Sequence, residues 1–170
     1  MKIVLYEYSE EWISLFKKEK HLLQEALGSK TSIIEHIGST SVKGLAAKPI
    51  IDIMIGLFDF SEADSLIVEI KALGYEYIPE YEDVMPYRRF FKKIMDGKVT
   101  HHIHMVSEGS EFWRRHLLFR DYLRMNSDIA NQYAALKKDL AKREWNDTNE
   151  YAEAKSEFIR KIEKIAALKC

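Results

Sequence analysis

The feature that most constrains this chain is a short apolar run, residues 49–57 (PIIDIMIGL), which carries a single charge at Asp52. A run this short and rich in β-branched residues predicts a strand buried in the middle of a sheet. A carboxylate inside such a strand is costly to bury unless it is paired, hydrogen-bonded or bound to a metal ion. Asp52 is therefore either half of a buried salt bridge, with Lys48 or an arginine, or part of a functional site.

Glycine and proline divide the chain into two parts. All three prolines and six of the seven glycines lie between residues 28 and 97, whereas residues 110–170 contain neither. This distribution predicts a mixed α/β part followed by an all-helical tail. We expect the 170 residues to form one domain, with a core at about 1–108 and a helical tail at about 109–170 packed on it.

The apolar periodicity predicts the elements of this fold. Helices are expected at 9–27, 61–73, 110–125, 127–144 and 149–168, and strands at 32–37, 49–57, 75–78, 89–95 and 99–106. The dipeptide Asp96-Gly97 is a strong signal for a hairpin between the last two strands. One βαβ-like connection together with an antiparallel hairpin implies an α/β (α+β) fold, a small mixed sheet flanked by helices.

Composition excludes several classes of protein. With 26 Lys and Arg against 27 Asp and Glu, the net charge of −1 gives no general attraction to nucleic acid or anionic lipid, and acids interleave the basic residues of the tail. No apolar stretch is long enough for a transmembrane helix, and the N-terminal residues do not form a secretory signal. The single cysteine, Cys170, excludes an internal disulfide and any Cys-based zinc cluster. We expect a soluble, cytoplasmic protein with a small-molecule partner, and the sequence leaves its oligomeric state open.

A loop with phosphate-binding chemistry precedes the Asp52 strand. Residues 38–41 read Gly-Ser-Thr-Ser directly after a predicted strand. Glycine lets the backbone approach an anion closely, and the loop amides and the hydroxyls of Ser39, Thr40 and Ser41 can donate to phosphate oxygens. Lys48 can neutralise further charge. The alternative is that Ser39 or Ser41 only caps a helix.

Two histidines share one face of a later strand. His102 and His104 are two residues apart, so their side chains point to the same side. With Asp52 they form a set of two imidazoles and one carboxylate, which suits Zn²⁺, Mn²⁺ or Fe²⁺. They can also contact phosphate or act as general acid and base near neutral pH. Glu35 is a further candidate for the metal shell; the alternative for the histidines is an exposed strand face, where they pair with helix carboxylates.

Four arginines are candidates for phosphate or core contacts. Arg120 and Arg124 are four residues apart on a predicted helix and share a face. From that face they can meet a triphosphate or the carboxylates of the core. Arg88 and Arg89 are adjacent on a predicted strand, so at most one of them faces the site.

Two aromatic–lysine pairs recur in the tail. Tyr133 with Lys137, and Tyr151 with Lys155, have the same spacing of four residues. Such pairs can stack on a base and bind phosphate. The alternative is that they are helix-packing tyrosines with lysines that extend along them.

The run 35–55 (EHIGSTSVKGLAAKPIIDIMI) resembles the signature of the GrpB family, small bacterial proteins assigned to the nucleotidyltransferase fold. Residues 102–104 (HIH) and 119–124 (FRDYLR) and the tail pairs match that family too. The resemblance implies a nucleotidyltransferase-like core in which Gly38 and Ser39 grip nucleotide phosphates and Asp52 is the first of two metal-binding acids. The second acid would fall at Met54, whose thioether is a poor Mg²⁺ ligand. Its absence weakens the case for two-metal chemistry.

The expected function is therefore nucleotidyltransferase-like, with a nucleotide or another phosphorylated small molecule bound at residues 38–41. The reaction would be metal-dependent nucleotidyl transfer from an NTP to a small molecule. Ser39 and Lys48 would position phosphate, while His102 and His104 would complete the metal shell or handle protons. The divalent metal near Asp52 is expected to be Mg²⁺ or Mn²⁺, with Zn²⁺ as an alternative.

Other functions stay open at this point. Met54 favours a non-catalytic module that binds a nucleotide or a coenzyme A precursor, the latter because a GrpB-like domain is fused to dephospho-CoA kinase in some bacteria. An HxH pair that converges with Asp52 on one metal would favour a metal-dependent phosphoesterase. A structural partner protein is the remaining alternative, and the sequence leaves open whether the chain is an enzyme.

Overall fold

The computed structural model describes residues 1–169, Ser32 by its backbone only; Cys170 and the expectation about its thiol lie outside the described residues. The strands are β1 (Thr31–Ile37), β2 (Ile51–Leu57), β3 (Tyr75–Tyr77), β4 (Arg88–Met95) and β5 (Lys98–Ser107). The helices are α1 (Glu11–Leu27), α2 (Ile67–Ala72), α3 (Glu111–Met125), α4 (Ser127–Ala141), α5 (Thr148–Ala154) and α6 (Ser156–Lys169). Short 3-10 turns are η1 (Gly28–Lys30), η2 (Ser39–Ser41), η3 (Phe60–Leu66) and η4 (Pro79–Tyr81). The predicted strands are all present, within two residues at each end.

The strands form a mixed sheet in the order β1-β2-β5-β4-β3. β2 and β5 are parallel, whereas β1 pairs with β2, β4 with β5 and β3 with β4 in the antiparallel sense. The apolar run therefore lies inside the sheet, between two other strands, as its composition predicts. The α/β (α+β) class with flanking helices is confirmed.

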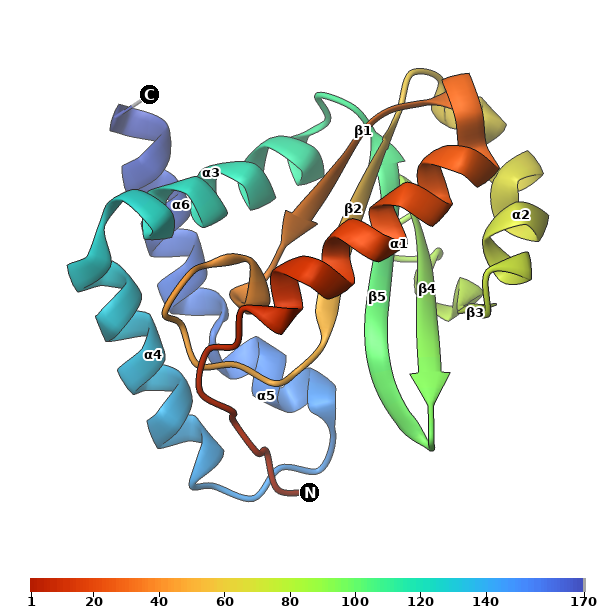
Figure 1. Ribbon diagram of the computed structural model, residues 1–170. Helices are drawn as coiled ribbons and strands as arrows, with labels where there is room; N and C mark the ends of the chain where they lie inside the picture. Colours follow the sequence, from red (N-terminus) through yellow and green to blue (C-terminus); the bar gives the residue numbers. More distant parts are fainter. Residues whose placement is uncertain (170) are drawn as a thin grey trace.

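Helices cover the two faces of the sheet unequally (Figure 1). On one face, α1 and α2 pack against Ile53, Ile55 and Ile103 to form the main core. On the other face, Phe112 and Trp113 of α3 pack on Met54. Alternation along β2 thus sends Asp52 and Met54 to the α3 face, while the isoleucines face α1. Within residues 1–169, no helix is both long and apolar enough to cross a membrane.

The hairpin between β4 and β5 follows the prediction. Asp96 and Gly97 have φ angles of 51° and 73°, both in the left-handed region. Two successive residues with positive φ match the twist of an antiparallel strand pair. After the hairpin, β5 runs parallel to β2, which places His102 and His104 beside Asp52.

The first helix begins at Glu11, two residues later than predicted, and three other helix boundaries differ more from the sequence prediction. The second helix begins as the 3-10 turn η3, and Asp59 rather than Ser61 supplies the cap, since the Asp59 carboxylate accepts from the Ser61 amide. α4 ends at Ala141 because the following segment pairs with the N-terminal residues, with a bridge between Lys2 and Glu144. The last predicted helix is divided into α5 and α6 at Lys155.

Candidate functional site

Asp52, His102 and His104, here called the triad, meet on the α3 face of the sheet. Asp52 and His102 are register partners on β2 and β5, and His104 lies two residues further along β5. Asp52 Oδ1 is 3.3 Å from His102 Nδ1 and 3.3 Å from His104 Nε2. One potential ligand atom from each residue lies within 4.8 Å of the others. The triad therefore has the proximity that a single metal ion or a proton relay requires.

Arg88 fixes the hydrogen-bonding state of His104. Its Nη1 lies 3.2 Å from His104 Nδ1. A guanidinium can only donate, so Nδ1 of His104 accepts, and the neutral ring carries its proton on Nε2, which donates to Asp52 Oδ1. A metal bound at Nε2 needs that proton moved to Nδ1. The Arg88–His104 hydrogen bond and metal binding at His104 therefore exclude each other.

The pKa values of Asp52 and His104 follow from burial and these contacts. Burial opposes ionisation of Asp52, but the hydrogen bonds and charges of His102 and His104 outweigh it and hold the pKa of the carboxyl below its usual range. Burial also lowers the pKa of His104, against the opposing Asp52 and with the help of Arg88. Near neutral pH the site thus contains a carboxylate beside a neutral imidazole, the states in which these groups bind a metal.

The position at which the family would have a second acid belongs to the core. Met54 is fully buried, at 0% exposure, and packs against Ile37, Val106 and Trp113. No second carboxylate joins Asp52 in the metal-sized cluster among the described residues. One carboxylate with two imidazoles does not fit a pair of Mg²⁺ ions, which prefer oxygen ligands, but the set fits a single Zn²⁺, Mn²⁺ or Fe²⁺.

The triad opens into a cavity of about 510 Å³, here called the triad cavity. Its polar wall, apart from the triad, is made by hydroxyls and basic side chains: Ser39, Thr40, Lys48, Arg88, Lys92, Lys137, Thr148 and Lys155. Of the two neighbouring strand arginines, only Arg88 faces it; Arg89 pairs with Asp64 instead. The cavity therefore joins the predicted Lys48 to lysines from two tail segments.

The tail lysines Lys137 and Lys155 lie in the triad cavity because α4 and the break after α5 reach it. Lys137 is only 2% exposed, and its Nζ donates to the Ala46 carbonyl at 2.5 Å. Burial lowers the pKa of Lys137 to about 7, and the Lys155 charge adds to the effect. Burial likewise lowers the pKa of Lys155 to about 8, with a contribution from Lys48. The four-residue Tyr–Lys spacing had allowed phosphate binding as one of two interpretations, and the structure places both lysines in the cavity.

The Gly-Ser loop approaches the triad through its glycine. Gly38 has a φ of 73°, and a Cβ at this position would lie 2.6 Å from Asp52 Oδ2. The loop hydroxyls are already engaged: Thr40 donates to the Ile50 carbonyl, Ser41 to the Gly38 carbonyl, and Ser39 is hydrogen-bonded to Tyr133. Ser39 and Thr40 line the triad cavity, whereas Ser41 does not. The main contribution of the loop is thus the close approach of its backbone to Asp52, because its hydroxyls already have hydrogen-bond partners.

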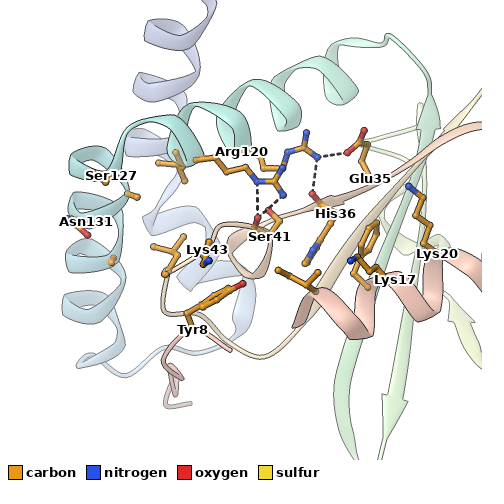
Figure 2. A pocket seen from close by; sticks show the side chains of 18 of the residues that line it. Tyr8, Lys17, Lys20, Glu35, His36, Ser41, Lys43, Arg120, Ser127 and Asn131 are labelled. Carbon is orange, nitrogen blue, oxygen red and sulfur yellow. Dashed lines mark hydrogen bonds and ion pairs between the residues drawn. The ribbon is translucent and has the colours of Figure 1, made fainter. Parts of the chain in front are cut away.

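The remaining candidates lie elsewhere. Arg120 donates to the Glu35 carboxylate and to the His36 carbonyl (Figure 2). Glu35 is therefore an ion-pair partner and does not join the metal-sized cluster of the triad. Arg124 donates through two nitrogens to the Ser41 carbonyl. These residues line a second cavity of about 710 Å³ between α1, α3, α4 and the loop after β1, here called the arginine cavity. The structure therefore separates Arg120, Arg124 and Glu35 from Asp52.

The comparisons with known proteins agree on one family. The sequence pattern of the family described as GrpB protein matches residues 2–165. The UPF0157 protein YqkA of Bacillus subtilis is 41% identical over 97% of this chain, which spans 47% of the length of YqkA. The glutamate-rich protein GrpB of Alkalihalophilus pseudofirmus is 34% identical over 95% of this chain and 94% of its own. A dephospho-CoA kinase of Mycolicibacterium paratuberculosis is 25% identical over 88% of this chain, but over only 42% of its own length.

Solved structures agree with the fold. The conserved protein GrpB from Enterococcus faecalis has a TM-score of 0.88 at 40% identity, covering 98% of both chains. The Cid1 poly(U) polymerase with Mg and 3'-dATP bound has a TM-score of 0.56 at 16% identity, over 81% of this chain and 44% of Cid1. The second likeness shows the nucleotidyltransferase-like fold and leaves the activity to be argued from the site.

Proposed function

Because the chain belongs to the GrpB family, we propose that it binds a nucleotide or another phosphorylated small molecule in the triad cavity. The fold shared with Cid1 supports this proposal, since that polymerase is described with 3'-dATP bound. The distant dephospho-CoA kinases add coenzyme A precursors to the ligands worth testing.

The charge of the triad cavity carries the proposal. Among the described residues, five Lys or Arg side chains line it against one acid, Asp52. No Lys or Arg in residues 1–169 makes an ion pair with Asp52, whose contacts are the two histidines. The positive side chains are thus left with charge to offer an anion, and several of them are partly withdrawn from water, which strengthens their attraction for phosphate. Lys48, Lys137 and Lys155 would hold the phosphate oxygens.

Two aromatic rings of the triad cavity lie against its cations. Tyr151 has Lys48 Nζ 5.5 Å and Lys155 Nζ 4.6 Å from its ring centroid, and Phe90 has the Arg88 guanidinium at 4.7 Å. Cations held over rings keep their remaining hydrogen-bond donors available to a ligand.

The test is to titrate the protein with ATP, UTP and dephospho-coenzyme A in the presence of EDTA, which removes metal ions. Binding is measured by calorimetry and by thermal melting. Binding to the native state raises the melting temperature by mass action. We expect Lys155→Gln to weaken binding about tenfold, the loss of one charged hydrogen bond. The exposed Lys161→Gln on α6 is the matched control and should bind as the wild type does. Saturable binding that is equal in both variants, or no binding at all, would contradict the proposal.

The convergence of the triad favours a second candidate, phosphoryl or nucleotidyl transfer or phosphoester hydrolysis with one metal ion. Asp52, His102 and His104 would hold the ion, which would polarise a phosphoryl oxygen when bound. Met54 argues against the two-metal form of this chemistry, because nothing at that position can hold a second ion.

Arg88 gives a direct test of this second candidate. Since its hydrogen bond competes with metal binding at His104, Arg88→Gln should bind Zn²⁺ or Mn²⁺ about tenfold more tightly than the wild type, the size of effect that partners of ligating histidines have. Calorimetric titration with the metal alone measures this change in affinity. Asp52→Asn, which removes the carboxylate ligand, should abolish metal binding. Unchanged or weaker metal binding in Arg88→Gln would favour the non-catalytic binding module.

A further inference from the structure

We propose that the arginine cavity is a second ligand site, which takes a small organic anion: a carboxylate or phosphate monoester carried on a flat apolar group. The cavity lies on the other side of the 38–41 loop from the triad cavity, since Ser41 lines the former while Ser39 and Thr40 line the latter. Figure 2 shows Lys17 and Lys20 entering from α1, Arg120 from α3, and Ser127 and Asn131 from α4. This proposal does not depend on the proposed function of the triad cavity.

The lining has more positive charge than its acid can balance. Among the described residues, five Lys or Arg side chains line the cavity against Glu35 alone. Glu35 is held by Arg120, which also takes the nearby Asp121 at 2.8 Å. Lys17 and Lys20 have no acid within ion-pair distance in residues 1–169, and Lys43 has only the exposed Glu10 at 4.0 Å. An anion would therefore gain attraction that the side chains of the protein do not supply.

Arg124 is the anchor that this geometry offers. It donates through Nε and Nη2 to the Ser41 carbonyl, a neutral acceptor, and its acidic neighbour Asp121 is 3.9 Å away and already bound by Arg120. The guanidinium is therefore oriented by the backbone while its charge is not neutralised at hydrogen-bond distance. Arginine held in this way suits a planar carboxylate or a phosphate.

Tyr8 supplies an independent indication of a ligand. Its hydroxyl oxygen is buried and has no hydrogen-bond partner among the described residues. In Figure 2 this hydroxyl points into the cavity, toward Ser41. A buried hydroxyl without a partner is costly, so a shift of the Tyr8 ring that brings the hydroxyl into contact with a ligand would gain a hydrogen bond. After such a shift the Tyr8 hydroxyl can donate to the same anion as Arg124.

The apolar part of the lining suits a flat apolar body. Phe16 of α1 stacks on His36 of β1, with ring centroids 4.7 Å apart and an interplanar angle of 15°. Apolar side chains continue the wall: Ile13, Ile34, Leu45, Leu123, Ala130 and Ala134. Ile13 is 38% exposed, which leaves apolar surface for a ligand to cover. Cations that surround an apolar patch with a stacked ring suit an aromatic or similarly flat anion.

Phenyl phosphate is the probe that matches both the cations and the apolar part of the lining. We expect saturable binding by calorimetry in EDTA, and loss of at least fivefold in affinity for Arg124→Gln and for Lys17→Gln, which removes an exposed charge and leaves packing intact. Arg114→Gln, on the exposed side of the same helix α3, is the matched control and should bind like the wild type. Benzyl alcohol, which lacks the anion, should bind at least tenfold more weakly than phenyl phosphate.

Lys155→Gln separates the two cavities. If phenyl phosphate affinity falls in Lys155→Gln and stays constant in Lys17→Gln, the probe occupies the triad cavity and the inference is overturned. Absence of saturable binding to the wild type overturns it too. Should Arg124→Gln fail to give a cooperative thermal transition, Lys17→Gln decides the matter, and an unchanged affinity there counts against the site.

Discussion

The triad cavity and the arginine cavity lie on opposite sides of one loop and have the same formal charges, five Lys or Arg and one acid among the described residues of each wall. They differ in what holds the acid. Glu35 is bound by Arg120, whereas Asp52 faces His102 and His104 and has no basic Lys or Arg partner in residues 1–169. Cavities of equal formal charge are thus two kinds of site. In the arginine cavity the acid is neutralised by an arginine, whereas in the triad cavity the acid and the imidazoles stay available for a metal or a proton.

The cations differ as well. The triad cavity relies on lysines whose pKa values burial has lowered, to about 7 for Lys137 and about 8 for Lys155. The arginine cavity relies on guanidinium groups, which stay protonated throughout the pH range in which proteins are stable. The two sites should therefore respond differently to pH and to substitution.

The largest expected effect concerns the loop between the cavities. Gly38→Ala adds a Cβ 2.6 Å from Asp52 Oδ2 at a position with positive φ, so we expect the free energy of unfolding to fall by about 2–5 kcal/mol. Urea denaturation measures the loss. Gly44→Ala is the control, since Gly44 also has positive φ but no atom within 4 Å of an added Cβ, and should cost only about 1 kcal/mol. Equal losses would mean that the close approach of Gly38 to Asp52 does not matter.

The next effect is on stability as a function of pH. Lys137 has its pKa lowered to about 7 in the folded state, so between pH 7 and 9 the unfolded chain binds more protons and stability rises with pH. Relative to Lys137→Met, the wild type should gain roughly 2.3 kcal/mol over these two pH units, because folded Lys137 is already half deprotonated at pH 7. Denaturation at several pH values measures the difference. Arg124→Met should show no such difference in slope, and a flat profile for Lys137→Met against the wild type would refute the lowered pKa.

A smaller effect should appear in ligand binding. Protonated Lys155 and Lys137 attract phosphate, and both lose protons as pH rises through about 7–8, so ATP affinity in the triad cavity should fall about tenfold between pH 7 and 9. Phenyl phosphate held by arginine should change less than twofold over the same range. Parallel calorimetric titrations compare the two, and identical pH profiles would remove the distinction drawn between the cavities.

The smallest effect compares the two acids. Glu35→Gln breaks the ion pair with Arg120 and should destabilise the protein by about 1 kcal/mol. Asp52→Asn keeps an oxygen that accepts from His104 Nε2 but loses the charge that the two histidines stabilise, so it should also cost about 1 kcal/mol. Thermal or urea denaturation at neutral pH compares these values. A larger cost for Asp52→Asn would show that Asp52 is chiefly a structural ion-pair partner.

The sequence predicted the parts of the fold that depend on local pattern. The β-branched run around Asp52, and Asp96-Gly97 in the hairpin, specify strand and turn through short-range physics, and strand alternation placed His102 and His104 on one face. The metal and phosphate roles of these residues stay predictions. So do the single domain over residues 1–170 and the cytoplasmic location.

What the sequence left open depends on how distant segments pack. For Lys137 and Lys155 it allowed either phosphate binding or helix packing, because helix periodicity does not encode that α4 and α5 fold back toward β2 and bring both lysines into the triad cavity. Arg120 and Arg124 share a helix face as expected, but that face meets Glu35 and Ser41 rather than Asp52. The break between α5 and α6 at Lys155 contains no glycine or proline from which it could have been predicted.

The mixed origin of the triad cavity also sets a time order for its assembly. The cavity takes Asp52 from β2, His102 and His104 from β5, and Lys155 from the segment between α5 and α6. A ribosome working at roughly 5–20 residues per second adds Lys155 about 5–20 s after Asp52. For that interval the nascent chain carries the Asp52 carboxylate without the lysine. Ligand binding in the triad cavity therefore requires that synthesis has passed Lys155. A chain truncated before α5 would lack the complete site.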